Sequence, residues 1–346
     1  MWSIHRAAGV FLGESKKMLK DDIIRELEEN RGVPVSGQYL ADKYNVSRNA
    51  VWKTINNLKK AGYQVVSATN SGYFLAEETD VISAQGIKTF LSDENKNIRI
   101  EVHEKIDSTN NEAKRLIISE TVDKMLIVAN EQTGGRGRLG RKFYSPADSG
   151  IYMSLIYHVP GGVKNPMLIT MAAAVAVSRT IEKLTDVHTG IKWVNDIFVG
   201  ERKVCGILTE AVSDLETGRL ENVVVGIGIN VKAENFPEEL RNIADTLNVE
   251  KVTRNQIIAG VLTELLKLYD SFDISDFMPE YIDHNIVVGR RVRYERPNPA
   301  GDTDSDNKDI FVIGTVEEVC MDGSLRVKSD DGIESCIFTG EIIFER

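Results

Sequence analysis

One stretch of the sequence combines flexible backbone with concentrated positive charge. Residues 132–141 read QTGGRGRLGR and hold four glycines and three arginines, whereas the whole chain carries a net charge of −10. Glycine lets a backbone approach a ligand closely, and the arginine fork matches the oxygens of a carboxylate or phosphate. Neither the GxxxxGK pattern nor a GxGxxG that opens a helix is present. The stretch predicts an anion-binding loop; the alternative is a basic surface loop or a nucleic-acid tract.

Three other short segments gather polar residues beside apolar runs. They are DSTN at 107–110, KWVND at 192–196 with RKVCGIL at 202–208, and GIGIN at 226–230. The first precedes a helical pattern at 112–117, so its side chains either cap that helix or hold a polar ligand at its amino end. The second predicts a β-hairpin whose lysines face either solvent or an anion. The third is an apolar strand whose glycines allow close packing by a strand or a ligand.

The composition is that of a globular protein with more than one domain. With 346 residues, 42% of them hydrophobic and 27% charged, the chain is expected to form two or three domains. Cys205, Cys320 and Cys336 form no CxxC pair, which disfavours disulfides and zinc and favours a cytoplasmic location. The apolar run at 167–177 is shorter than the ~20 residues of a membrane span and predicts a buried helix. Residues 1–15 are expected to be an unstructured leader.

The amino-terminal segment differs from the rest of the chain in charge. Residues 16–76 contain ten basic and six acidic side chains, a local excess of +4. Apolar spacing predicts helices at 21–30, 37–44 and 48–61, followed by hairpin strands at 63–66 and 73–75. This is the pattern of a winged helix-turn-helix, whose third helix enters the major groove of DNA; the alternative is a protein-interaction module. The residues expected to contact DNA are Ser47, Arg48, Asn49, Lys53 and Asn56.

The order and combination of these motifs are more specific than any one of them. STN, GGRGRLGR, KWVND, RKVCGIL and GIGIN together resemble the biotin–protein ligases. The winged helix ahead of them is similar to the bifunctional members, which combine a biotin ligase with a biotin-operon repressor. The resemblance implies an α+β multidomain fold. Its parts are a winged helix at 16–78, a central domain at 81–284 related to class II aminoacyl-tRNA synthetases, and an SH3-like β-barrel at 287–346.

The carboxy-terminal sequence agrees with a small β domain. Four short alternating segments, at 291–294, 311–315, 324–327 and 335–338, are separated by turn signals such as Asp-Gly. A polar insert at 297–309 interrupts this pattern and is expected to be a surface loop.

The resemblance implies a reaction in two steps. The carboxylate of biotin attacks the α-phosphorus of ATP and gives biotinyl-5′-adenylate and pyrophosphate. A lysine of a biotin carboxyl carrier protein then attacks the adenylate. Both steps require positioned cations and no enzymic nucleophile. ATP and biotin are the expected substrates and Mg²⁺ the expected metal. The expected partners are the carrier protein, operator DNA and, once the adenylate is bound, a second copy of the chain.

The resemblance also assigns roles residue by residue. Biotin is expected to contact Ser108, Thr109, Asn110, Gln132, Arg136, Gly137, Arg138 and Lys203. ATP or the adenylate is expected to contact Arg136, Arg138, Lys192, Asn195 and Asn230. The expected catalytic side chains are Arg136, Arg138, Lys203 and Asp196. The ATP phosphates are expected to hold most of the Mg²⁺ coordination, with Asp196 as one further candidate ligand. Gly226 and Gly228 are expected to line the site, Phe236 is a candidate for stacking on adenine, and Arg141 has no assigned role.

Two other functions remain open at this point. A lipoate-type ligase would use the same scaffold, although the combination of GGRGRLGR with KWVND disfavours it. A biotin-sensing transcription factor that has lost its ligase activity is the second, although Arg136, Arg138 and Lys203 are all present.

Overall fold

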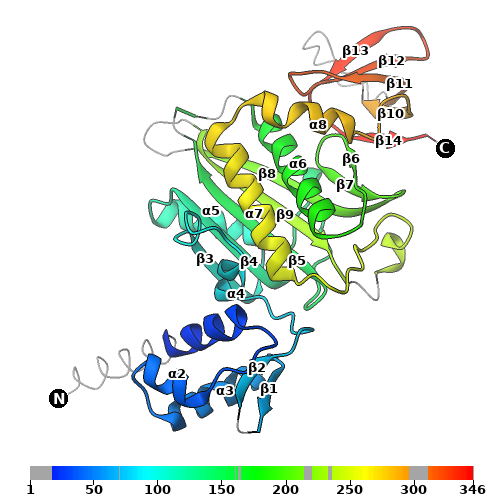
Figure 1. The fold of residues 1–346 in the computed structure, drawn as a ribbon. Helices are drawn as coiled ribbons and strands as arrows, with labels where there is room; N and C mark the ends of the chain where they lie inside the picture. The colour runs from blue at the N-terminus through cyan, green and yellow to red at the C-terminus, as the bar shows by residue number, and fades with distance from the viewer. Residues whose placement is uncertain are drawn as a thin grey trace. The chain divides into compact units, whose positions relative to one another are not determined.

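Figure 1 shows the fold of the chain as a computed structural model. The structure describes residues 18–69, 71–159, 161–162, 165–213, 220–232, 236–295 and 311–345. The expected leader at 1–15 and the polar insert at 297–309 lie outside the described residues. The chain divides into two compact units, one made of Met1–Asn97 and Glu250–Gly260, the other of Ile98–Val249 and Val261–Arg346.

The first unit contains a winged helix. Its elements are a helix at 18–29, α2 (Gly37–Lys43), α3 (Arg48–Lys60), β1 (Val65–Ala68) and β2 (Gly72–Leu75). Ser47 fixes the start of α3, because its side chain accepts a hydrogen bond from the backbone N–H of Ala50 at 3.2 Å. Val51, Ile55 and Leu58 of α3 are buried, as their helical spacing predicts. The prediction of three helices and a hairpin is confirmed, with ends displaced by a few residues.

The hairpin of this unit depends on a glycine. Gly72 has a φ of +126°, and a Cβ atom there would lie 2.1 Å from the backbone oxygen of Val35. Val35 and Tyr73 exchange two backbone hydrogen bonds, at 2.8 and 2.9 Å. The wing is thereby fixed to the segment that leads into α2.

The second unit is built on a seven-stranded sheet with the strand order β3-β4-β5-β9-β8-β7-β6. Its strands are β3 (Arg99–Ile106), β4 (Lys124–Gln132), β5 (Gly150–His158), β6 (Gly190–Lys192), β7 (Asp196–Val199), β8 (Arg202–Ser213) and β9 (Leu220–Asn230). Strands β3 and β4 are parallel and are joined by α5 (Thr109–Ser119), whereas the other neighbours are antiparallel. The carboxyl ends of β3, β4 and β9 and the amino end of β8 consequently meet at one edge of the sheet.

Helices cover both faces of this sheet. Asn110 of α5 donates a hydrogen bond to the side chain of Glu210 at 2.8 Å, whereas Thr170 of α6 (Pro166–Leu184) donates one to Thr209, also at 2.8 Å. Successive side chains of a strand point to opposite faces, so α5 and α6 lie on opposite sides (Figure 1). The apolar run at 167–177 lies within α6 and is buried from Leu168 on, as predicted. None of the helices described is both long and apolar enough to cross a membrane.

The remaining elements complete the two units. The helices are α4 (Ala84–Thr89), α7 (Arg254–Ser271) and α8 (Met278–Asp283), with 3-10 turns at Arg138–Gly140, Glu238–Leu240 and Ile274–Asp276. The carboxy-terminal strands are β10 (Arg291–Glu295), β11 (Phe311–Val319), β12 (Leu325–Ser329), β13 (Glu334–Ile337) and β14 (Ile342–Phe344). They form a five-stranded antiparallel sheet in the order β13-β12-β11-β10-β14, which confirms a small β domain.

Candidate active site

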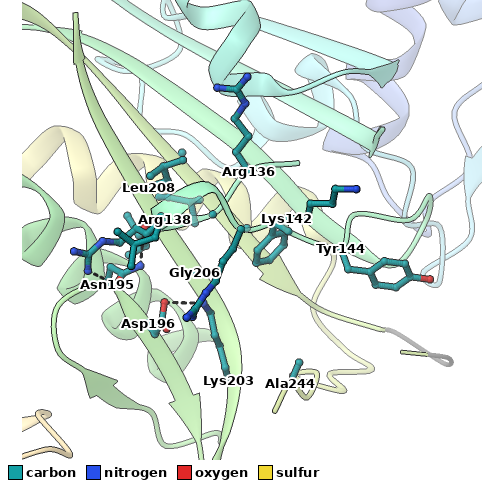
Figure 2. Close-up of a pocket in the computed structure, with 18 of the residues that line it drawn as sticks. Arg136, Arg138, Lys142, Tyr144, Asn195, Asp196, Lys203, Gly206, Leu208 and Ala244 are labelled. Atoms are coloured by element: carbon teal, nitrogen blue, oxygen red, sulfur yellow. Dashed lines mark hydrogen bonds and ion pairs between the residues drawn. The ribbon is translucent and has the colours of Figure 1, made fainter. Parts of the chain in front are cut away.

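A cavity of about 460 Å³ opens at the edge of the large sheet. It is bounded by the glycine–arginine loop (residues 132–141), by β6 to β9 and by the segment before β14. Figure 2 shows part of its lining. The structure brings together here every residue that sequence reasoning assigned to biotin, ATP or catalysis. They are Ser108, Thr109, Asn110, Gln132, Arg136, Gly137, Arg138, Lys192, Asn195, Asp196, Lys203 and Asn230. Gly226, Gly228 and Phe236 line the same cavity.

The lining is strongly basic although the chain is acidic. Its six basic side chains are Arg136, Arg138, Arg141, Lys142, Lys192 and Lys203, against the two carboxylates of Asp196 and Glu341. A cavity with this excess of cations is suited to a ligand that carries several negative charges.

The glycine–arginine loop folds back on itself. The backbone N–H of Gly137 donates to the carbonyl of Arg141 at 2.8 Å, and the N–H of Phe143 donates to the carbonyl of Gly135 at 2.9 Å. A Cβ atom on Gly135 would lie 2.5 Å from the backbone oxygen of Phe143, so only glycine allows this approach. Leu139, at the tip, has a φ of +55° and is 71% exposed. The loop is therefore a short hairpin that presents its side chains to the cavity.

The three arginines of the loop have different surroundings. Arg138 donates to the side-chain oxygen of Asn195 at 3.1 Å and to the backbone oxygen of Gly340 at 3.2 Å. Its burial lowers the pKa of its guanidinium group, although Asp196 lies close enough to oppose that shift. Arg141 makes a two-pronged ion pair with Glu341. Arg136 is exposed and points away from Arg138 (Figure 2).

Arg136 and Arg138 were both expected to contact biotin and the adenylate. In this structure the two guanidinium groups diverge, and the charge of Arg136 helps to lower the pKa of the Glu210 carboxyl. Bringing both groups onto one ligand therefore requires the loop to move.

The KWVND segment connects β6 to β7 and places Lys192, the amide of Asn195 and the carboxylate of Asp196 at the wall of the cavity. Lys203 of β8 approaches Asp196 of β7 to 2.7 Å between ammonium nitrogen and carboxylate oxygen (Figure 2). Asn195 donates its side-chain N–H to the backbone oxygen of Ile207 at 2.9 Å. Trp193 is buried, and its indole N–H donates to the backbone oxygen of Gly323 at 2.9 Å. The segment is thus held from β8 on one side and from the carboxy-terminal sheet on the other.

The other end of the cavity is lined by neutral hydrogen-bonding groups. Gln132 accepts hydrogen bonds from the backbone N–H of Thr109 at 2.8 Å and from its hydroxyl at 3.2 Å, and it donates to Ser145 at 3.0 Å. The buried hydroxyl of Ser154 lies 2.7 Å from the hydroxyl of Thr109 and 2.6 Å from the amide oxygen of Asn110. Each amide is therefore held in one orientation before any ligand arrives.

The alternative that Ser108, Thr109 and Asn110 serve as ordinary helix caps is not what the structure shows. Ser108 is the N-cap residue of α5, but its side chain makes no capping hydrogen bond. Thr109 and Asn110 lie inside the first turn of the helix, and all three residues are buried at the cavity wall. Their place in the cavity lining favours the ligand-binding interpretation.

A charged pair behind the wall fixes Asn110. Its side-chain N–H donates to Glu210 at 2.8 Å, and Glu210 accepts from Lys114 at 2.7 Å. Burial raises the pKa of the Glu210 carboxyl, but the hydrogen bonds from Lys114 and Asn110 outweigh burial and hold the pKa below its ordinary value. A Cβ atom on Gly226 would lie 2.1 Å from the amide oxygen of Asn110. The glycine of the GIGIN strand therefore makes room for this side chain.

Sequence reasoning missed two groups of lining residues. Phe143 packs its ring on the backbone of β9, where a Cβ atom on Gly228 would lie 2.5 Å from it. The glycine spacing of GIGIN was the signal for such a flat contact, but it did not name the ring. Gly340, Glu341 and Ile342 also line the cavity. No local pattern marks them, because their neighbours in the site lie far away in the sequence.

Comparison with known proteins places this geometry among related chains. The profile of the Biotin/lipoate A/B protein ligase family matches residues 102–230, and that of an HTH domain matches residues 20–74. The chain is 35% identical over 269 residues to the bifunctional ligase/repressor BirA of Bacillus subtilis (strain 168), covering 76% of this chain and 82% of that protein. It is 27% identical over 266 residues to the protein of the same name from Escherichia coli (strain K12), covering 75% and 80%.

A solved structure is similar as well. The biotin protein ligase from Aquifex aeolicus in complex with biotin and ATP superposes with a TM-score of 0.58 at 26% sequence identity. The match covers 72% of this chain and 99% of that one.

The Lys114–Glu210 pair predicts a pH-dependent contribution to stability. A carboxyl whose pKa is lowered by folding stabilises the fold above its unfolded pKa, and this contribution is lost as the pH falls through the folded pKa. Lys114→Met should raise the pKa of Glu210 and cost about 0.5–1 kcal/mol at neutral pH, a difference that disappears in acid. Carboxyl NMR titration of Glu210 and thermal unfolding at both pH values measure these effects.

The matched control is Lys105→Met, which removes the exposed ion pair with Glu131 in the same unit. It should leave the pKa of Glu210 unaltered. An unchanged pKa of Glu210 in Lys114→Met would show that the pair does not set its charge.

Proposed function

Since the chain belongs to the family of bifunctional biotin ligases and repressors, we propose that this cavity is where it joins biotin to ATP. The chain is an ATP-dependent biotin–protein ligase, and its helix-turn-helix domain gives it a second role as a biotin-responsive repressor. The observation that supports this assignment is that the two ends of the cavity differ in their chemistry. Fixed neutral groups line one end, and Arg138, Lys192 and Lys203 lie at the other, which suits a ligand with a ureido ring and a carboxylate.

We assign the neutral end to the ureido ring of biotin. Ser108, Thr109, Asn110 and Gln132 supply donors and acceptors there. Hydrogen bonds to Ser145, Ser154 and Glu210 already orient the side chains of Thr109, Asn110 and Gln132. Preformed hydrogen-bonding groups reject analogues that lack the matching polar atoms, because the buried groups would remain unpaired. This favours biotin over lipoate, which has no ureido group.

Adenylation follows at the basic end. A carboxylate oxygen of biotin forms a bond to the α-phosphorus of ATP while the bond to the β-phosphate oxygen breaks, which gives the adenylate and pyrophosphate. Arg138, Lys192 and Lys203, with Asn195 and Asn230, are the residues we assign to the oxygens on which negative charge gathers. Positioned cations stabilise that charge more strongly in a cavity than in water. Arg136 and Gly137 join the ligand when the loop closes.

Transfer requires a neutral amine. The lysine of the acceptor protein attacks the carbonyl carbon of the adenylate, AMP leaves, and the new amide loses a proton. We propose that Asp196 orients this lysine or takes its proton. Asp196 is paired with Lys203 at 2.7 Å in the structure, so it becomes available once Lys203 turns to the adenylate. The acceptor we propose is a biotin carboxyl carrier protein.

We propose that Mg²⁺ enters as the complex with ATP. Among the residues that the structure describes, no three His, Cys, Asp or Glu side chains could hold a metal together. The two carboxylates of the cavity, Asp196 and Glu341, already face Lys203 and Arg141. We therefore propose that the phosphates of ATP, rather than the described side chains of the cavity, supply most of the ligands of Mg²⁺.

Several further features belong to the same proposal. Tyr144 and Phe236 form a tilted aromatic pair, with centroids 6.3 Å apart, at the cavity mouth, and we assign Phe236 to the adenine. The five carboxy-terminal strands suit an SH3-like barrel over 287–346, after a catalytic domain at 81–284 and a winged helix at 16–78.

Because the role as a repressor requires operator DNA, we place the protein in the cytoplasm.

The DNA-reading surface we propose is the outer face of α3. Arg48, Asn49 and Lys53 are exposed there, and Asn56 lies partly exposed on the same helix. The hydroxyl oxygen of Ser47 accepts the capping hydrogen bond from Ala50, and its hydroxyl proton can still be donated to a phosphate. We propose that adenylate binding favours a homodimer, because two winged helices are needed to read two half-sites of an operator.

The first expected result concerns substrate choice. Biotin should drive ATP–pyrophosphate exchange, lipoate and octanoate should not, and biotin should pass to the lysine of a carrier domain. A carrier whose acceptor lysine is replaced by arginine is the control. Exchange with lipoate alone would identify a lipoate-type ligase, and ligand binding without transfer would identify a sensor that has lost its ligase activity.

The second expected result concerns Arg138. Because a buried hydrogen bond between charged groups is lost, Arg138→Ala should release biotinyl-adenylate roughly 10- to 100-fold faster. Trapping of the released adenylate by free lysine or hydroxylamine measures the rate. Arg202→Ala, which removes an exposed pair with Asp245 beside Lys203, is the matched control. Unchanged retention in Arg138→Ala would contradict its role.

The third expected result concerns assembly and DNA. Sedimentation velocity should show a doubling of mass when biotin and ATP are added, and the dimer should shift duplexes selected from a random pool. Arg48→Ala should lose DNA binding and still dimerise, because it changes only the winged helix. A mass that stays the same with both substrates would count against the homodimer.

A further inference from the structure

The six cations of the cavity are not held in the same way. Lys203 faces the carboxylate of Asp196, Arg141 faces that of Glu341, and Arg138 donates to two neutral oxygens. Arg136 and Lys142 are exposed to water. Lys192 is the exception, since it is half-buried and its ammonium group forms neither an ion pair nor a hydrogen bond with any residue that the structure describes.

The neighbours of Lys192 are aromatic rings. Its ammonium nitrogen lies over the ring of Phe344 at 5.0 Å from the centroid and over that of Phe198 at 6.0 Å. Phe344 belongs to β14, the strand that follows the residues facing Arg138 and Arg141. The guanidinium of Arg290 lies 5.1 Å from the same centroid. A strand at the far end of the chain thus reaches a lysine of the KWVND motif.

A ring and a carboxylate hold a lysine with different consequences. A carboxylate neutralises the ammonium group, so an incoming phosphate must break an ion pair. The face of a ring attracts the cation through its quadrupole but leaves its charge intact and its three N–H donors free. Burial lowers the pKa of Lys192, with Asp196 and Glu341 opposing and Lys203 and Arg141 adding to that effect. The ring therefore attracts the ammonium group at this position and leaves its N–H donors available to a ligand.

We infer that Phe344 is a positioning residue for ATP, which holds the ammonium of Lys192 in the cavity ready for the nucleotide phosphates. The inference rests on the proposed assignment of Lys192 to those phosphates. Phe344 does not line the cavity itself, so it acts through the lysine. The carboxy-terminal sheet therefore contributes to adenylation and has no such part in the later transfer, when the triphosphate has gone.

The test compares four single variants and one double variant of the full chain. Phe344→Leu keeps an apolar side chain and removes the ring, Phe344→Trp restores a ring face, and Lys192→Met gives the reference loss. Arg290→Met removes the other cation near the ring and is the matched control, since Arg290 is exposed and does not line the cavity. Each is assayed for the KM of ATP in biotin-dependent pyrophosphate exchange and for transfer from supplied biotinyl-adenylate to a carrier domain.

Phe344→Leu should raise the KM of ATP roughly three- to tenfold. Transfer from supplied adenylate should stay unchanged, Phe344→Trp should restore the KM, and Arg290→Met should match the wild type. Adding Phe344→Leu to Lys192→Met should cause no further loss. Ring-current shifts of the Lys192 ε-methylene protons in NMR spectra should vanish in Phe344→Leu, which tests the contact without any activity.

Distinct results would overturn the inference and the proposed function. An unaltered KM of ATP in Phe344→Leu beside a raised one in Lys192→Met would refute the role of Phe344. Equal loss in both half-reactions without rescue by tryptophan would show a purely structural part. An unaltered KM in Lys192→Met would overturn the assignment of that lysine, and with it this inference. Absence of exchange in the wild type would refute the proposed function itself.

Discussion

Repulsion between like charges is the constraint on which the rest of this structure depends. Six basic side chains share one cavity. Two unit charges about 6 Å apart repel by roughly 3 kcal/mol at an effective dielectric constant of about 20. Such a cluster persists in the absence of ligand only if the surrounding protein offsets the repulsion. The two carboxylates, the backbone and amide oxygens and the aromatic faces around the cavity serve this purpose.

The source of these compensating groups explains the architecture. Asp196 and Asn195 come from the hairpin that also supplies Lys192, whereas Gly340, Glu341 and Phe344 come from the last strand and its preceding turn. The small carboxy-terminal sheet thus contributes directly to the wall of the cavity. The opposite end of the cavity needs no such compensation, because its groups are neutral and pair with one another. The cavity therefore has one end lined by neutral hydrogen-bonding groups and one end lined by charged groups.

Much of the local structure could be predicted because its causes are local. The serine before α3, the apolar stripe of that helix and the alternating strands of the tail each depend on residues a few positions apart. Ser108 shows the limit of this reasoning. Its position before α5 suggests a capping hydrogen bond, but its side chain forms none. This end of the helix lies instead at the buried wall of the cavity. The need to cap a helix is local, whereas the presence of a cavity at its end is not.

The sequence by itself determined which residues gather in the site. The glycine, arginine, lysine and amide motifs are each contiguous, and their residue types indicate which chemical groups they can bind. The tertiary structure alone decided how they are arranged. It turned Arg136 away from Arg138, placed the ring of Phe143 on Gly228, and brought Glu341 to Arg141 across 200 positions of the chain. The physical reason is that charge pairing and ring contacts act through space over a few ångströms. Sequence patterns register only neighbours along the chain, so these contacts exist only once the two sheets have formed.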